Sequence, residues 1–178
     1  MATGHGDFAL SMADLRVVAR YAVECAEPVL PLFEADRPDD PRPRAAVHAA
    51  WVFVRGEPRT KRQRVAALDA HRAAGVAVTA AGRAAARAAG DAAAAAYLHP
   101  LAKPTQTGHI LRAAAFAAHA SELAAGGRAA VGEEVIAQAR RRATPALVEV
   151  LRRYPPAPEG RSRVNQLWKA LDTALRCR

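Results

Sequence analysis

Alanine dominates the middle of this chain. Between residues 80 and 96 the alanine run is interrupted only by two glycines, two arginines and Asp91. Alanine has the highest intrinsic helix propensity and a side chain that adds little buried area, so such a run specifies helices that pack closely together. The charged residues within the run argue against a helix that crosses a membrane. We therefore expect a soluble helical protein without a membrane partner.

The chain length favours one domain. With 178 residues, 51% of them hydrophobic, the chain can bury one substantial core and is too short to make two domains the better expectation. Apolar residues recur at helical spacing, and no alternating strand pattern is present. The prediction is an all-α, single-domain helical bundle of about seven to eight helices over residues 11–178, preceded by a flexible N-terminus at residues 1–10.

Local capping signals mark several of the expected helix starts. Ser11 with Asp14, and Thr60 with Gln63, have the form of a capping box, and Asp91 has the form of an N-cap for a short alanine-rich helix. Further helix ends are expected at Asp40, Gly56, Thr105 or Thr107, Gly126-Gly127, Thr144 and Ser162. Interruptions of helical regions are expected at Pro28, Pro31, Gly75 and Gly82.

Charge is distributed unevenly along the chain. Residues 1–60 carry 7 basic and 9 acidic side chains, whereas residues 61–178 carry 19 and 8, for a formal net charge of +9. Because 23 of the 26 basic residues are arginine, beside abundant alanine, glycine and proline, the basic character reflects a GC-rich coding sequence in part. It is therefore a weak argument for nucleic-acid binding, but it predicts two electrostatically different regions.

Sequence signatures of metal, cofactor and covalent chemistry are missing. No two histidines are spaced i, i+4, and there is no phosphate-binding glycine loop, serine elbow or CxxC pair. We therefore expect no metal and no cofactor. The two cysteines, Cys25 and Cys177, suit free thiols in a reducing compartment, and no secretory signal is visible. The expected location is the cytoplasm.

One loop presents charges on a rigid backbone. The stretch Asp36–Arg44 holds charges of both signs among three prolines, and rigid presentation lowers the entropic cost of binding. As partner-binding residues we select Asp36, Asp39, Asp40, Arg42, Arg44 and Arg55. The equally weighted alternative is a connector between two helices, in which Asp40 caps the second helix and the charges pair with one another.

Two other functions remain open. A small helical enzyme or small-molecule binder could build a polar pocket between helices from Glu24, Glu27, Arg44, His71 and His109, with the two carboxylates and two histidines as catalytic residues. For each of these five residues the ordinary explanation is a side chain that packs in the core or lies solvated on the surface. A basic nucleic-acid binder could use Arg140-Arg141-Arg142 and Arg152-Arg153, but the interleaved aromatics that bind single strands are nearly absent.

Several segments together resemble a known family. They are Glu24-Cys25-Ala26-Glu27, Asp39-Asp40-Pro41-Arg42-Pro43-Arg44-Ala45, Trp51 with Arg55-Gly56, His71, and Arg87-Ala88-Ala89-Gly90. Over about residues 12–125 the chain resembles alanine-rich helical immunity proteins of bacterial polymorphic-toxin systems. The resemblance implies a cytoplasmic antidote that binds and neutralises a cognate protein toxin without catalysis. The chain departs from the family pattern where Asp91 and Tyr97 stand in place of expected histidines, while His109 is retained.

Overall fold

The computed structural model describes residues 8–178, and every regular element in that range is helical, so the predicted all-α class is confirmed. Part of the expected flexible N-terminus, residues 1–7, lies outside the described residues. The α-helices are α1 (Met12–Ala26), α2 (Leu30–Asp36), α3 (Arg42–Val54), α4 (Lys61–Ala74), α5 (Ala80–Ala94), α6 (Thr107–Ala124), α7 (Ala129–Arg142), α8 (Pro145–Arg152) and α9 (Arg163–Arg176). Three 3-10 turns, Glu27–Val29, Ala95–Tyr97 and Pro104–Gln106, join some of them.

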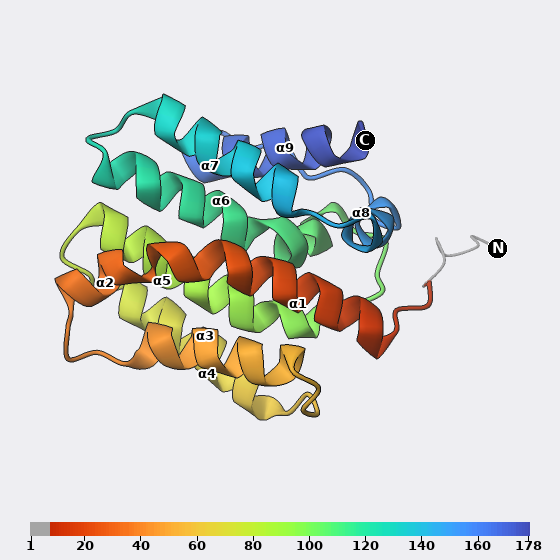
Figure 1. Cartoon of the computed structure of the whole chain (residues 1–178), viewed down its shortest axis with the longest axis horizontal. Helices are drawn as coiled ribbons and strands as arrows, with labels where there is room; N and C mark the ends of the chain where they lie inside the picture. The colour runs from red at the N-terminus through yellow and green to blue at the C-terminus, as the bar shows by residue number, and fades with distance from the viewer. Residues whose placement is uncertain (1–7) are drawn as a thin grey trace.

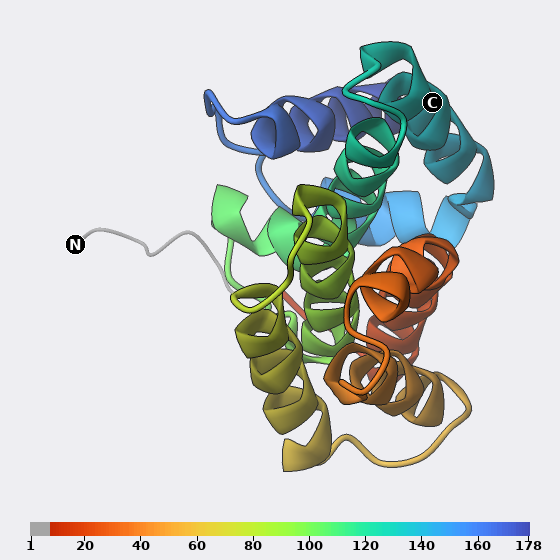
Figure 2. The same cartoon turned by 90° about the vertical axis from the view of Figure 1, so that its left-hand side faces the viewer.

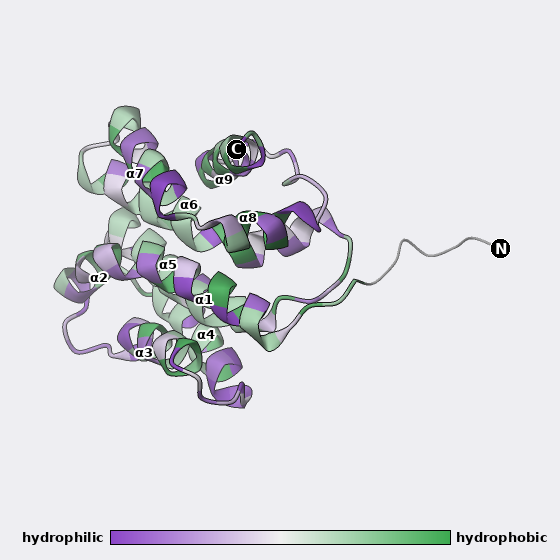
Figure 3. Cartoon of the chain, turned by 45° about the vertical axis from the view of Figure 1, so that its right-hand side comes forward, coloured by the Kyte–Doolittle hydropathy of each residue, from purple (hydrophilic) through white to green (hydrophobic). Residues whose placement is uncertain are grey.

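The two alanine-rich helices α5 and α6 form the centre of the molecule. They pack against each other, with α3 and α4 toward one end of the bundle and α7 and α9 toward the other (Figures 1 and 2). Seven alanines of α5 are buried, because a helix enclosed on several sides has room only for small side chains. The alternation of hydrophobic and hydrophilic residues along the outer helices fits one buried face on each (Figure 3).

Most of the predicted helix ends are present. Ser11 and Thr60 each complete a capping box, with Asp14 and Gln63 respectively, and the predicted interruption after α1 is the turn Glu27–Val29. The predicted break at Gly75 also occurs, because α4 ends at Ala74. Further predicted ends are observed at Gly56, Gly126, Gly127, Thr144 and Ser162.

Gly82 does not interrupt a helix, contrary to the prediction. It lies in the first turn of α5, where a Cβ atom would come within 2.6 Å of the Asp36 carboxylate. That carboxylate accepts a hydrogen bond from the backbone N–H of Thr79 at 2.7 Å. The glycine therefore permits the approach of α2 to the start of α5.

The predicted N-cap at Asp91 is wrong. Helix α5 continues through Gly90 and Asp91 to Ala94, and the Asp91 side chain is 2% exposed. A buried carboxylate within a helix needs tertiary partners, and these partners define the candidate site described below.

The last helix is fixed by buried contacts. Trp168 and three leucines of α9 face the core, and Asp172 accepts hydrogen bonds from the backbone of Ala157 and from Arg176. These contacts hold the C-terminal half of α9 against the segment that follows α8. None of the helices within residues 8–178 is long and apolar enough to cross a membrane.

Candidate functional site

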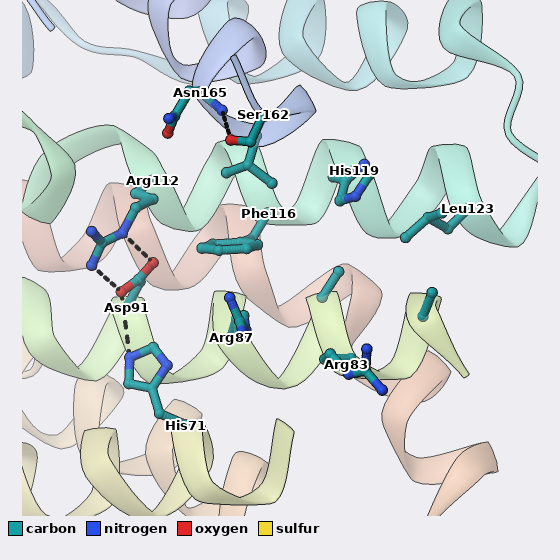
Figure 4. Close-up of a pocket in the computed structure, with 13 residues that line it drawn as sticks. His71, Arg83, Arg87, Asp91, Arg112, Phe116, His119, Leu123, Ser162 and Asn165 are labelled. Atoms are coloured by element: carbon teal, nitrogen blue, oxygen red, sulfur yellow. Dashed lines mark hydrogen bonds and ion pairs between the residues drawn. The ribbon is translucent and has the colours of Figure 1, made fainter. Parts of the chain in front are cut away.

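An open cavity of about 670 Å³ lies between α5, α6 and the start of α9, and we call it the α5–α6–α9 groove (Figure 4). Helix α4 contributes only His71, at one end. The remaining lining residues are Ala80, Arg83, Ala84, Arg87, Asp91, Arg112, Phe116, His119, Leu123, Ser162, Val164 and Asn165. The groove thus combines a small-residue helix, an aromatic ring and several basic side chains.

Asp91 lies at one end of the groove and is held by two basic side chains. Arg112 donates two hydrogen bonds of 2.8 Å to its carboxylate, and His71 Nε2 lies 3.4 Å from Oδ1 (Figure 4). Burial raises the pKa of Asp91, but the contacts with Arg112 and His71 outweigh burial and hold the pKa below its ordinary value. The carboxylate therefore stays ionised at neutral pH and acts only as an acceptor.

A second carboxylate near the groove is held in the same way. Glu122 of α6 accepts from Arg163 of α9 at 2.9 and 3.0 Å, and His119 Nδ1 lies 3.4 Å from it. Burial raises the pKa of Glu122, and the contacts with Arg163 and His119 lower it by more, so it falls below its ordinary value. Asp91 and Glu122 are thus each placed between one arginine and one histidine.

Two arginines in the middle of the groove have no such partner. Arg83 and Arg87 lie one turn apart on α5, both are exposed, and neither forms an ion pair with a carboxylate among residues 8–178. The guanidinium of Arg87 lies over the Phe116 ring, 5.8 Å from its centroid. Because Asp91 is matched by Arg112, the lining of the groove carries a net positive charge.

The groove is therefore suited to binding an anion. Its carboxylate is engaged by Arg112, whereas Arg83 and Arg87 present guanidinium donors in the fork geometry that matches carboxylates. In the part of the chain that the structure describes, no group of three or more His, Cys, Asp or Glu side chains is arranged to hold a metal ion.

The family comparison agrees with the resemblance seen in the sequence. The sequence profile of the Imm-5 like putative immunity protein family matches residues 9–145. The chain belongs to this family. No curated protein and no solved structure matches it.

The matched region of this Imm-5 like protein covers α1 to α7 and includes every groove residue of α4, α5 and α6. It ends before α9, which supplies Ser162, Val164 and Asn165. The family region therefore carries the positive charge of the groove, and the C-terminal helix adds polar groups at its edge.

The five residues predicted to share one polar pocket lie apart in this Imm-5 like protein. Glu24 faces a small cavity between α1 and α7, Glu27 accepts a 3.1 Å hydrogen bond from the Trp51 indole, and Arg44 pairs with Glu34. His109 is half-buried on α6, where burial and the nearby Arg112 lower its pKa. Only His71 lines the groove, where it contacts Asp91.

The predicted partner-binding loop makes many internal contacts. Asp40 accepts hydrogen bonds from the backbone and side chain of Arg42, Arg44 pairs with Glu34 at 2.8 Å, and Asp36 accepts from the start of α5. These contacts are those of the connector alternative, except that the N-cap of α3 is Pro41 and not Asp40. Asp39 and Arg55 are exposed, and Arg55 lies over the Trp51 ring at 5.8 Å. The loop remains a predicted contact surface.

The residues that build the groove were largely missed in the sequence. Arg83, Arg87 and Asp91 recur every four residues, which places them in one row on α5. That spacing was a usable signal of a charged face on an otherwise alanine helix. The partnership with Arg112 could not be inferred, because it depends on which faces of α5 and α6 meet.

Proposed function

We propose that this Imm-5 like protein is a non-enzymatic immunity protein of a bacterial polymorphic-toxin system, acting in the cytoplasm. It binds a cognate protein toxin in a stoichiometric complex and blocks it. The observation that carries the proposal is the unmatched charge of Arg83 and Arg87 in a groove whose one lining carboxylate, Asp91, is already engaged by Arg112. Family membership over residues 9–145 supports the same role.

Binding suits this groove better than acid–base chemistry. Asp91 and Glu122 are the buried carboxylates at the two ends of the groove, and both are held ionised by arginines, so neither carries a proton to donate near neutral pH. Helices α5 and α6 form a closely packed framework, so the groove needs little rearrangement to bind a partner.

A second contact region is proposed at the junction of α1 with α3 and the adjoining loop. The guanidinium groups of Arg20 and Arg55 each lie within 6 Å of the centroid of the Trp51 ring, and Asp39 is exposed on the loop. Tryptophan and arginine are the residue types that most often dominate the binding energy of protein interfaces. The internal contacts of the loop hold this surface in place, and they involve Asp36, Asp40, Arg42 and Arg44.

The direct test is complex formation with the toxin encoded beside this chain. Both proteins are purified, mixed, and analysed by size-exclusion chromatography with light scattering and by titration calorimetry. We expect a stable complex of fixed stoichiometry, and loss of toxin activity at the same molar ratio. Absence of binding to every product of the neighbouring genes would contradict the proposal.

A second candidate function is the binding of a small anionic molecule, with or without catalysis. The cavity volume of about 670 Å³ lies within the range of small-ligand sites, and His71 is oriented by Asp91 at its rim. A thermal-shift screen with phosphorylated and carboxylated metabolites tests it. A stabilising ligand that leaves toxin neutralisation unchanged would favour this candidate over the first.

A further inference from the structure

The basic side chains of the α5–α6–α9 groove are arranged in a line. Arg83 and Arg87 follow each other by one turn of α5, which separates their Cβ atoms by about 5–6 Å. Alternate residues of an extended chain lie about 6.6 Å apart on one face. The length of the arginine side chains accommodates this small difference, so two alternate residues of one extended strand can contact both guanidinium groups.

The central arginine is positioned before any partner arrives. The Arg87 guanidinium lies over the half-buried Phe116 ring, and that contact restricts its orientation while leaving donors exposed. A side chain that is already oriented loses less conformational freedom on binding. Arg87 is therefore the stronger of the two expected contacts.

The buried carboxylates at the two ends of the groove are each paired with an arginine. At one end Asp91 is matched by Arg112, and beside the other end Arg163 pairs with Glu122 and lies 4.0 Å from the exposed Glu133. The side chains of Ser162 and Asn165 at the start of α9 add neutral polar groups. The unpaired positive charge of the groove is therefore concentrated in its middle, at Arg83 and Arg87.

We propose that the α5–α6–α9 groove binds an extended acidic segment of the protein partner, with Arg83 and Arg87 contacting carboxylates at alternate positions. The proposal rests on the proposed function for the identity of the partner, and it specifies which surface is used and what chemistry it recognises. The segment carries two Asp or Glu residues separated by one residue.

A polypeptide fits the groove better than a nucleic acid does. Phe116 is the one aromatic side chain in the described lining, and its face is covered by Arg87. A single-stranded nucleic acid gains much of its affinity by stacking bases on exposed aromatic rings. Carboxylates need only the guanidinium donors, which remain available.

The test compares two variants of equal charge. The groove variant, Arg83→Glu with Arg87→Glu, reverses the charge of the two groove arginines. The control variant, Arg62→Glu with Arg140→Glu, changes the net charge by the same amount. Its two positions are exposed, and their side chains have no ion pair among residues 8–178. Affinity for the cognate toxin is measured by calorimetry at one salt concentration. We expect the groove variant to bind at least about tenfold more weakly and the control variant within about twofold of the parent. Equal affinity of the groove variant and the parent would overturn the proposal.

A second measurement does not depend on the toxin. The ¹⁵N-labelled protein is titrated with a synthetic peptide of eight glutamates, with inorganic phosphate and with an eight-nucleotide single-stranded DNA. We expect peptide-induced shifts concentrated on α5, α6 and the start of α9, and their loss in the groove variant. Tighter binding of phosphate or DNA at the same residues, or shifts scattered over all arginines, would overturn the proposal. A failed toxin complex with a positive peptide result would reject the immunity function alone.

Discussion

The imidazole of His71 lies directly against the backbone of Gly90, so closely that a Cβ atom at residue 90 would come within 2.8 Å of Nε2. Glycine at this position does not end the helix, because α5 continues to Ala94. It lets α4 place His71 beside Asp91, with Nε2 3.4 Å from Oδ1. Two of the segments that carry the family resemblance, His71 and Arg87–Gly90, thus meet at the end of the groove.

Replacing Gly90 by alanine therefore acts through His71. In an unobstructed helix, alanine stabilises by up to about 1 kcal/mol relative to glycine. Here the methyl group must displace the imidazole, and crowding of this kind costs about 1–3 kcal/mol. We expect Gly90→Ala to lower the free energy of unfolding by about 1 kcal/mol in urea titrations. In a His71→Ala background, where the imidazole is absent, the same Gly90→Ala change should instead raise the free energy of unfolding. A stabilised single variant would show that the contact is not as close as the structure has it.

Asp91→Asn tests the buried carboxylate. The substitution leaves the Arg112 guanidinium without its counter-charge, and removal of one partner from a buried pair is strongly destabilising. Because Arg112 is 40% exposed, solvent reduces the effect, and we expect a loss of about 2 kcal/mol in the free energy of unfolding. The matched control is Asp69→Asn, whose partner Arg72 lies on the surface and is 70% exposed. We expect Asp69→Asn to lower the free energy of unfolding by less than about 1 kcal/mol. Equal losses in the two variants would contradict the tertiary role of Asp91.

The same pair predicts a dependence of stability on pH. The pKa of Asp91 in the folded protein lies below its ordinary value of 3.8, so as pH falls the unfolded chain takes up the proton first. The stabilisation is therefore complete well above pH 3.8 and is lost as pH falls through the folded pKa. We expect the stability difference between the parent and Asp91→Asn to be present at neutral pH and to shrink as pH falls below 4.

Urea titrations at several pH values measure this difference directly. Asp14, Asp40 and Glu122 also have lowered pKa values, so the parent and the variant both lose stability in acid for reasons unrelated to Asp91. Subtracting one curve from the other isolates the contribution of Asp91. A difference that grows toward pH 3 would have the wrong sign and would contradict the lowered pKa.

Helix boundaries were largely predictable because their determinants are local. Ser11 and Thr60 cap helices through hydrogen bonds to residues two or three positions later, and Gly126 and Gly127 adopt the positive φ that ends α6. Such signals lie within a few residues of the boundary. The fold class follows from them and from the helical spacing of apolar residues.

The site was not predictable in the same way because its determinants are distant. His71 and Arg112 lie 20 and 21 residues from Asp91, and only the packing of α4 and α6 on either side of α5 brings them together. Taken locally, an aspartate after a glycine in an alanine-rich stretch has the form of a helix cap, which is how Asp91 was misassigned. Burial of a charge decides its role, and burial is a tertiary property.

The two cysteines should differ sharply in reactivity. Cys25 is buried, with Arg142 Nη1 at 3.6 Å from Sγ, and burial raises the pKa of its thiol to about 11 even though Arg142 acts to lower it. At pH 8 only roughly one molecule in a thousand carries the Cys25 thiolate, which is the nucleophilic form. Cys177 is exposed at the end of α9. We expect a chromogenic disulfide reagent to modify one thiol per native molecule and two in urea.

Single substitutions assign the two thiols. Cys177→Ser should abolish the fast phase, so that the remaining thiol reacts only as fast as the helices around Cys25 open. Cys25→Ser should leave the fast phase unchanged, because Cys177 lies in the C-terminal turn, outside the packed interior of α1. Fast labelling of native Cys177→Ser would mean that the face of α1 carrying Cys25 is open to solvent, and the burial that raises its pKa would be contradicted.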